Sequence, residues 1–161
     1  MKQVPSTAPV AVRVARAADH AFLVEANRAM ARETEGRELD QGRLAAGVEA
    51  ALADPVRGSY RVAEIGGRAA GCLMLTREWS DWRNAWIWWI QSVFVAPEFR
   101  RRGVYAALHA RVLSDARAAG DVVGVRLYVD QGNAGAQRTY SALGMERSHY
   151  QMFETEDLGS A

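Results

Sequence analysis

The run from Trp86 to Val95, WIWWIQSVFV, limits the possible folds more than any other part of this chain. Gln91 and Ser92 are its only polar residues. A half-exposed strand alternates between apolar and polar residues, whereas a strand that is covered on both faces reads as a nearly continuous apolar run. Pro97 then ends the segment. The run therefore predicts a central strand in a sheet that carries helices on both faces.

The segments around this run predict a mixed order of strands and helices, β-α-α-β-β-β-α-β-α-β. Helices are expected between Asp19 and Met30 and between Asp40 and Asp54, where apolar residues recur at helical spacing, and then at Val104–Ala119 and Asn133–Leu143. Strands are expected at Val10–Val14, Tyr60–Ile65, Arg68–Thr76, Trp86–Val95, Val122–Val129 and Met145–Phe153. Gly66-Gly67 is typical of a hairpin turn. This order favours an α/β fold with one mixed sheet flanked by helices on both faces.

Length and composition narrow the class of protein. A chain of 161 residues suits one domain, expected at 10–156, with a loose leader at 1–9 and a tail at 157–161. The formal net charge of +1 gives no support for nucleic-acid binding. No apolar stretch approaches the ~20 residues that a membrane helix needs, so we expect no membrane partner and a cytoplasmic location. Cys72 and the three histidines show no metal-ligand spacing, so we expect no metal.

The segment Val93–Leu108 joins the apolar strand to a helix through a short basic turn. Three arginines, Arg100 to Arg102, precede Gly103 at the start of the helix. A helix N-terminus offers unpaired backbone N–H groups and partial positive charge, and glycine lets an anion approach the backbone closely. The segment therefore predicts a phosphate or diphosphate site. The bland alternative is an exposed basic corner, and the segment matches neither a P-loop nor a dinucleotide fingerprint.

The same segment resembles the signature of the GNAT N-acetyltransferases, Arg/Gln-x-x-Gly-x-Gly/Ala after a strand that ends in a hydrophobic-x-Val-x-Pro pattern. Arg100 and Gly103 match, while Arg101 and Tyr105 stand where many members have glycine or alanine. The resemblance implies the GNAT fold and acetyl-CoA as co-substrate. The implied contacts for acetyl-CoA in this segment are Val93, Phe94, Val95, Arg100, Arg101, Arg102, Gly103, Val104, Tyr105 and Ala106.

A second match lies about 30 residues downstream. Asn133-x-x-Ala136-x-x-x-Tyr140-x-x-x-Gly144-Met145 resembles the family's Asn-x-x-Ala-x-x-x-Tyr-x-x-x-Gly-Phe segment. The family resemblance implies that Asn133 and Ala136 bind the cofactor and that Tyr140 lies near its sulfur. Taken alone, Asn133 is better explained as a helix cap and Tyr140 as a packed aromatic residue. Because both motifs occur in the right order, the resemblance covers most of the chain, from about Val12 to Phe153.

The resemblance implies direct transfer of an acetyl group to an amine, with no covalent enzyme intermediate. Tyr140 is the hypothetical proton donor to the leaving thiolate, and backbone N–H groups at Phe94 and Val95 are the expected donors to the thioester oxygen. Many family members carry a glutamate four residues before the final valine of the central strand. This position is Gln91, which cannot accept a proton. A water chain or another carboxylate is therefore required; the candidates are Glu33, Glu35, Glu78 and Asp81, each of which could equally be a solvated surface charge.

The amine acceptor is the least constrained part of this interpretation. Trp79 and Trp82, beside Glu78 and Asp81, could hold a cationic amine, with Glu35 also on the acceptor side. By alternation, Trp89 shares one face of its strand with Gln91, and Trp86 shares the other with Trp88; one of these sets could pack against a second copy in a homodimer. The acceptor is expected to be a small-molecule or peptide amine. Amino acids, polyamines, aminoglycosides and protein N-termini stay open. The alternative function is an acetyl-CoA-binding sensor with little turnover.

Overall fold

The computed structural model describes residues 8–156 and 158–159. The chain divides into two compact units, one up to Leu127 and the other from Tyr128 onward, and each is described by itself. The first unit contains β1 (Val10–Val14), α1 (His20–Glu35), α2 (Gln41–Ala53), β2 (Ser59–Ile65), β3 (Arg68–Ser80), β4 (Ala85–Val95), α3 (Val104–Ala119) and β5 (Val122–Arg126). Two short 3-10 turns lie at Ala17–Asp19 and Pro97–Phe99. The expected leader at 1–9 lies outside the described residues up to residue 7, and so do residues 157, 160 and 161 of the expected tail.

The five strands form one mixed sheet in the order β1-β2-β3-β4-β5. Neighbours from β1 to β4 are antiparallel, and β5 runs parallel to β4. The Gly66-Gly67 turn connects β2 to β3 as predicted, with both glycines at positive φ. The strand β3 continues to Ser80, four residues beyond the expected end at Thr76. Glu78 and Trp79 therefore lie within this strand, beyond its expected end.

A bulge interrupts the alternation of β4 at Ser92. Met74 pairs with Gln91 and Cys72 pairs with Phe94, so β4 advances three residues where β3 advances two. Ser92 adopts φ 51°, a conformation that residues other than glycine rarely take. The extra residue explains why Ile90, Val93 and Val95 pack on one face while Phe94 packs on the other.

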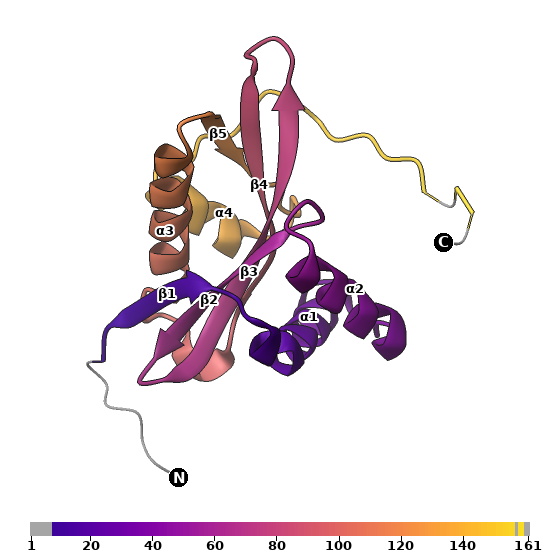
Figure 1. Ribbon diagram of the computed structural model, residues 1–161, viewed down its shortest axis with the longest axis vertical. Coiled ribbons are helices and arrows are strands. Elements are labelled where there is room, and N and C mark those ends of the chain that lie inside the picture. Colours follow the sequence, from indigo (N-terminus) through magenta and orange to yellow (C-terminus); the bar gives the residue numbers. More distant parts are fainter. Residues whose placement is uncertain (1–7, 157, 160–161) are drawn as a thin grey trace. The chain divides into compact units, whose positions relative to one another are not determined.

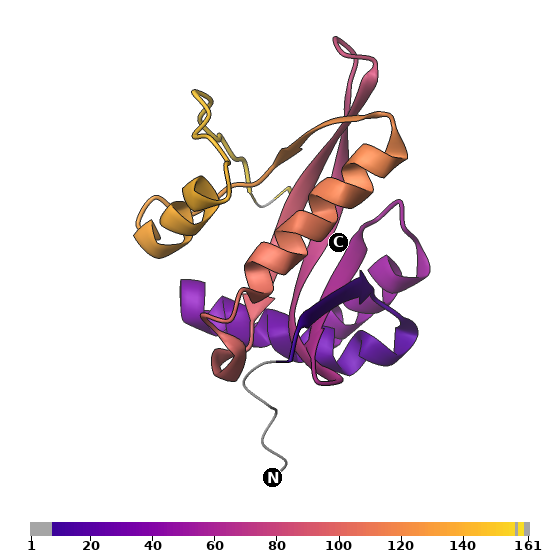
Figure 2. The ribbon, with the colours of Figure 1, turned by 90° about the vertical axis from the view of Figure 1, so that its left-hand side faces the viewer.

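Helices cover both faces of this sheet, as predicted (Figure 1). On one face, the buried residues Val104, Leu108 and Val112 of α3 pack against Leu73, Leu75 and Ile90. On the other face, residues of α1 and α2 such as Leu23 and Val48 pack against Val62, Cys72 and Phe94. Figure 2 shows α3 lying along the sheet, with its N-terminal end near the turn that follows β4.

A buried ion pair fixes α3 to its face of the sheet. Arg61 on β2 is 7% exposed, and its Nε donates to Asp115 Oδ2 of α3 at 2.9 Å. Arg111 Nε donates to the other oxygen of Asp115 at 2.7 Å, and Arg111 Nη1 donates to the backbone carbonyl of Val12 on β1 at 2.7 Å. Because one carboxylate is shared by two guanidinium groups, loss of Asp115 would leave Arg61 as a buried cation without this partner.

The second unit contains α4 (Ala134–Ala142), close to the predicted helix. Gly144, with φ 85°, follows the helix, and Met145 N donates to Tyr140 O at 3.0 Å, so the predicted stop at Gly144 is confirmed. The predicted strand Met145–Phe153 is wrong: these residues have no strand structure, and Tyr150, Met152 and Phe153 are exposed. A strand needs hydrogen bonds from a neighbouring strand, which local alternation cannot provide.

In the first unit, β5 also differs from its prediction, since it ends at Arg126, three residues before the expected Val129.

Candidate active site

The turn between β4 and α3 has the backbone shape of an anion site. Arg101 and Gly103 both adopt left-handed φ angles, 60° and 74°. Gly103 is the N-cap of α3 and offers no side chain to cap the helix, so the N–H groups of the first turn have no side-chain cap. A Cβ built at Gly103 would meet no atom within 4 Å, so the space beside this residue is open. Backbone N–H groups at a helix N-terminus without a side-chain cap are suited to phosphate.

Positive charge surrounds this turn. Phe99 is buried and anchors the turn in the core. The guanidinium groups of Arg68 and Arg102 lie over its ring, 5.1 and 5.6 Å from the ring centre. These cations therefore lie on the same aromatic side chain at the entrance to α3. Guanidinium groups are the side chains best matched to phosphate oxygens, so the charge agrees with the backbone geometry.

Arg100, the anchor of the first motif, has two contacts within the first unit. Its Nε donates to the carbonyl oxygen of Val95 at 3.1 Å, and its Nη2 donates to Glu33 Oε2 of α1 at 2.7 Å. Both side chains of the ion pair are more than 40% exposed, so the pair is weak and can be exchanged for a ligand. The structure therefore places Glu33, a candidate base, against the basic turn.

Beyond Trp89, one edge of β4 has no strand partner within residues 8–156 and 158–159, and we call this the open edge. The parallel ladder with β5 ends at the pair Trp89–Arg126, whereas β4 stays paired with β3 as far as Val95. Ala96 N donates to Ala70 O, toward β3. Because N–H groups along a strand alternate in direction, the N–H of Val95 points away from β3 and that of Phe94 points toward it. Of the two expected oxyanion donors, Val95 is thus the one on the open edge.

Gln91 and Glu78 lie on the same face of the sheet, the face that α1 and α2 cover. Gln91 Nε2 lies 3.5 Å from Thr76 Oγ1. Glu78 Oε2 accepts a hydrogen bond from Trp89 Nε1 at 2.6 Å, and Arg126 Nη1 lies 3.4 Å from both Glu78 oxygens. Among the candidate bases, Glu78 is therefore held on the face that also carries Gln91.

The other acceptor-side candidates are spread over the surface. Glu35 pairs with Arg37 at 3.6 Å at the end of α1. Asp81 accepts from the backbone N of Trp82 in the turn between β3 and β4, where Trp82 is 94% exposed. Trp79 packs edge-on against Trp86, with ring centres 4.9 Å apart. The hairpin thus holds Trp79, Asp81 and Trp82, and Glu35 lies on a separate element.

A cavity that sequence reasoning missed lies on the α1 and α2 face of the sheet. Its volume is about 400 Å³, and it is lined by Asn27, Leu44, Gly47, Val48, Ala50, Ala51, Arg57, Tyr60, Met74 and Ser92. These residues come from two helices, three strands and the turn before β2. No local pattern could have grouped them, since the strand bulge at Ser92 is visible only in the register with β3.

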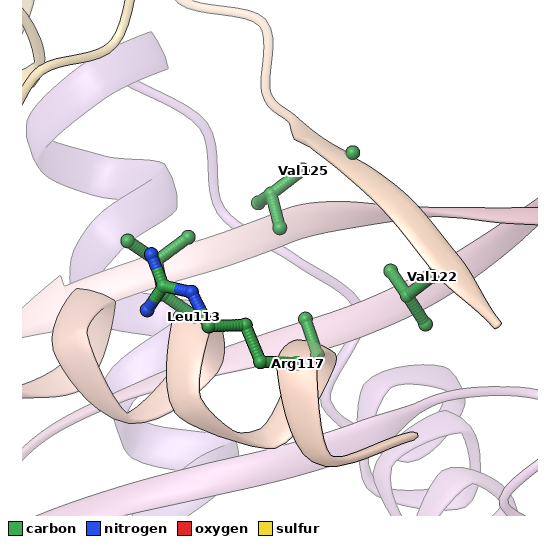
Figure 3. Close-up of a pocket in the computed structure, with 6 residues that line it drawn as sticks. Leu113, Arg117, Val122 and Val125 are labelled. Atoms are coloured by element: carbon green, nitrogen blue, oxygen red, sulfur yellow. The ribbon is translucent and has the colours of Figure 1, made fainter. Parts of the chain in front are cut away.

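A second cavity of about 150 Å³ lies between α3 and β5 (Figure 3). Leu113, Arg117, Val122 and Val125 are among the residues that line it. It lies beside the C-terminal half of α3, at the opposite end of the helix from Gly103, and it is smaller than the ~300 Å³ of ordinary ligand sites. We therefore assign it no part in the candidate site.

In the second unit, the two residues singled out by the second motif lie on α4 and at its start. Asn133 Oδ1 accepts from the backbone N of Ala136 at 3.0 Å, so Asn133 caps the helix. Tyr140 lies on the last turns of α4, and burial raises the pKa of its phenol above the ordinary value. Tyr140 therefore stays protonated at neutral pH, as a proton donor must.

Comparisons with known proteins agree with the motifs. The chain matches the Acetyltransferase (GNAT) family over residues 18–145. A possible acetyltransferase from Clostridium difficile 630 is 39% identical, with a TM-score of 0.86 over 91% of this chain and 97% of that one. The aminoglycoside N-acetyltransferase AAC(6')-Iy in complex with CoA is 20% identical, with a TM-score of 0.74 over 96% of this chain and 99% of that one. A predicted acetyltransferase from Clostridium acetobutylicum, solved with acetyl-CoA, is 16% identical, with a TM-score of 0.74 over 93% and 97%. The search of curated proteins gave no match.

The chain belongs to the GNAT acetyltransferase family, because the family match covers most of its length. The expected fold is confirmed by the similarity to the Clostridium difficile protein. Membership also confirms the expected co-substrate, acetyl-CoA, which this family of acetyltransferases uses. Within residues 8–156 and 158–159, no cluster of three or more His, Cys, Asp or Glu side chains is placed to hold a metal ion. None of the helices described there is both long and apolar enough to cross a membrane.

Proposed function

We propose that this protein transfers the acetyl group of acetyl-CoA to a primary amine of a small molecule. The observation that carries this proposal is the turn before α3, where Gly103 opens the helix N-terminus and Arg100 to Arg102 supply positive charge. A diphosphate carries the charge and the oxygen acceptors that such a turn binds. When bound, acetyl-CoA supplies an activated acetyl thioester.

The residues of the first unit fit the cofactor at two points. The diphosphate would bind at the turn from Arg100 to Ala106, where the space beside Gly103 is open. The acyl arm would lie along the open edge of β4, where the N–H of Val95 points away from β3. Arg100 is hydrogen-bonded to the carbonyl of Val95, so it ties the basic turn to that edge. Asn133, Ala136 and Tyr140 are further proposed contacts, carried over from the family motif.

The transfer forms a bond between the amine nitrogen and the acetyl carbon and breaks the bond between that carbon and sulfur. The amine loses one proton and the departing thiolate gains one. The N–H of Val95 would stabilise the negative charge that develops on the carbonyl oxygen. Tyr140, protonated at neutral pH, would donate to the thiolate.

Removal of the amine proton is assigned to a chain of waters that leads to Glu78, since the strand register places Glu78 four residues along β3, about 13 Å, from the partner of Gln91. Gln91 lacks a carboxylate, and Glu33 pairs with Arg100 beside the turn that is proposed to hold the diphosphate. Glu78 lies on the same face as Gln91 and is oriented by Trp89 and Arg126. The test is kcat/KM of Glu78→Gln in a thiol-release assay. We expect a large loss of rate with unchanged affinity for acetyl-CoA; an unchanged rate would exclude Glu78 and leave a water chain, Glu33, Glu35 or Asp81.

The acceptor class, the homodimer and the cytoplasmic location are also proposals. AAC(6')-Iy acts as an aminoglycoside N-acetyltransferase, and its 20% identity supports the same fold but does not transfer its substrate. Trp79, Asp81, Trp82 and Glu35 are the acceptor contacts proposed from the sequence. The second candidate function, an acetyl-CoA sensor with little turnover, is favoured by the absence of a carboxylate at Gln91.

The proposed function is tested by calorimetric titration with acetyl-CoA and CoA, followed by a thiol-release assay with a panel of amines. Arg100→Gln should weaken binding about tenfold, because a charge-assisted contact to phosphate is lost. Arg117→Gln, at the other end of α3, is the matched control and should bind as the wild type does. Tight binding without thiol release from any amine would favour the sensor. Absence of binding by the folded wild type would refute both functions.

A further inference from the structure

The cavity beside Ser92 lies against the strand whose open edge is proposed to hold the acetyl group. Ser92 is the bulge residue of β4, three residues before Val95, and it lines the cavity. Its φ of 51° is a strained conformation for serine, and such strain is concentrated at functional sites. The cavity, at about 400 Å³, falls in the lower part of the range for small-molecule sites. Its size suits a small amine rather than an oligosaccharide.

The walls of this cavity are mostly apolar and carry a single charge. Of its ten described lining residues, the apolar ones come mainly from α2 together with Met74, and the neutral polar ones are Asn27, Tyr60 and Ser92. Arg57 is the one charged residue among them. A wall without a carboxylate offers no partner to a second ammonium group, so polyamines are poorly matched to it.

Asn27 and Tyr60 form a fixed, uncharged floor. Asn27 is 7% exposed, and its Nδ2 donates to the carbonyl of Leu23 at 2.9 Å. Tyr60 is 5% exposed, and burial raises the pKa of its phenol, although a hydrogen bond with Asn27 opposes this effect. The phenol therefore carries no charge at neutral pH. These groups can orient a ligand by hydrogen bonds but cannot neutralise a cation.

Arg57 is available to an anion at the edge of the cavity. It lies in the turn between α2 and β2, where its Nε is 3.4 Å from Asp54 Oδ2. Its side chain is 66% exposed and that of Asp54 is 45% exposed, so this ion pair is weak. Asp54 also accepts a hydrogen bond from the backbone N of Val56 through its other oxygen at 3.0 Å. An incoming carboxylate can thus replace Asp54 on Arg57 without disturbing the turn.

We propose that the cavity binds the acceptor, an inference that rests on the proposed function. The acceptor is a small apolar amine bearing one carboxylate, such as an aliphatic amino acid. The carboxylate pairs with Arg57, the apolar part contacts α2 and Met74, and the amine points to the bulge at Ser92. The acceptor nitrogen becomes an amide and the carboxylate stays unchanged. This assignment differs from a cationic amine held by Trp82 and Asp81 at the tip of the hairpin.

The first experiment measures equilibrium binding and needs no turnover. Protein labelled with ¹³C at its methionine methyl groups is titrated with N-acetyl-L-leucine and with N-acetyl-L-leucinamide, and the Met74 signal is assigned with Met74→Leu. We expect the carboxylate ligand to shift the Met74 signal and to bind about tenfold more tightly than the amide, because only the carboxylate gains a charged hydrogen bond. An unshifted Met74 signal, or equal affinity for the two ligands, would overturn the proposal.

Substitutions in the Arg57–Asp54 ion pair should change the affinity for N-acetyl-L-leucine in opposite directions. Arg57→Gln should remove the preference for the carboxylate ligand. Asp54→Asn keeps an acceptor for Val56 but frees Arg57, so it should tighten binding. Arg43→Gln, an exposed arginine on α2, is the matched control. A merely structural role for Arg57 would weaken both ligands equally and would not produce opposite effects in the two variants.

The second experiment compares acceptors by thiol release from acetyl-CoA. L-leucine should give a kcat/KM at least tenfold above that of L-leucinamide and of spermidine, and Arg57→Gln should abolish this preference without changing the affinity for acetyl-CoA. A higher kcat/KM with spermidine would overturn the acceptor class and leave the acetyltransferase assignment standing. Failure to bind acetyl-CoA would refute the proposed function, whereas the Met74 titration would still report on the cavity by itself.

Discussion

Gly103 and Gly120 flank the same helix and provide a matched pair of substitutions. Gly103 precedes α3 with φ 74°, and Gly120 follows it with φ 78°. A Cβ at either position would meet no atom within 4 Å. Substitution by glutamate at the two positions therefore shares one cost, the left-handed backbone, which is about 1–2 kcal/mol for a residue with a Cβ, and the helix macrodipole changes it by about 0.3–1 kcal/mol, in favour of Gly103→Glu and against Gly120→Glu. In a chain of 161 residues the shared cost lowers Tm by about 2–8 °C for either variant.

The two variants should differ in their affinity for acetyl-CoA. In Gly103→Glu, a negative charge lies beside the proposed diphosphate. If two negative charges of the diphosphate lie about 5 Å from the glutamate carboxylate, the repulsion is about 1.7 kcal/mol even at the dielectric constant of water. That energy corresponds to more than a tenfold loss of affinity. Gly120→Glu places the same charge at the opposite end of α3, about 24 Å away by helix rise, where it is screened by salt.

The assay is calorimetric titration of acetyl-CoA into both variants, with Tm measured by differential scanning calorimetry on the same samples. We expect the two Tm values to agree within a few degrees and the affinity to fall only in Gly103→Glu. Equal affinity of the two variants for acetyl-CoA would show that the diphosphate does not bind at this turn, and the reasoning from its backbone geometry would then be refuted.

Four further substitutions or reactions test the fold and the chemistry. Asp115→Asn should lower the free energy of unfolding, measured by urea titration, by about 3 kcal/mol at pH 7, because it removes a partner of buried Arg61. Burial raises the pKa of Asp115, but hydrogen bonds from a neighbouring α3 arginine and from Arg61 outweigh burial and hold the pKa below its ordinary value. The contribution of Asp115 to stability is therefore present above about pH 4 and is lost as the pH falls further. Gly71→Ala should cost about 1–3 kcal/mol in the same assay, because a Cβ there would lie 2.7 Å from a backbone carbonyl of β4. Burial raises the pKa of Cys72 to about 12, so iodoacetamide at pH 8 should label the thiol only after denaturation, as read by mass spectrometry. Tyr140→Phe should lower kcat about hundredfold with little change in the KM for acetyl-CoA; an unchanged kcat in the thiol-release assay would remove Tyr140 as the proton donor.

The sequence predicted the elements whose signals are local. The apolar run from Trp86 indicated the central strand, Gly66-Gly67 the hairpin, and Gly144 the end of the last helix. Each of these depends on hydrophobic pattern or on the backbone freedom of glycine, which are properties of a few adjacent residues. The basic turn at Arg100–Gly103 was predictable for the same reason.

The strand expected at Met145–Phe153 failed because pairing is not a local property. Alternation in a short segment shows only that it could lie on a sheet, and a ladder with a neighbour decides whether it does. The same reasoning explains why the extension of β3 to Ser80 was missed. There, cross-strand contacts such as that between Trp79 and Trp86 continue the hairpin beyond the apolar residues.

The sequence by itself determined the family, the order of elements as far as α4, and the position of the candidate diphosphate turn, because each is encoded in short motifs at fixed spacing. Only the tertiary structure decided which charges meet. It placed Glu33 on Arg100 and Glu78 between Trp89 and Arg126, and it opened a cavity beside Ser92. These contacts join residues far apart in the chain, and their distances depend on strand register, on the bulge in β4 and on helix packing, none of which a local pattern contains.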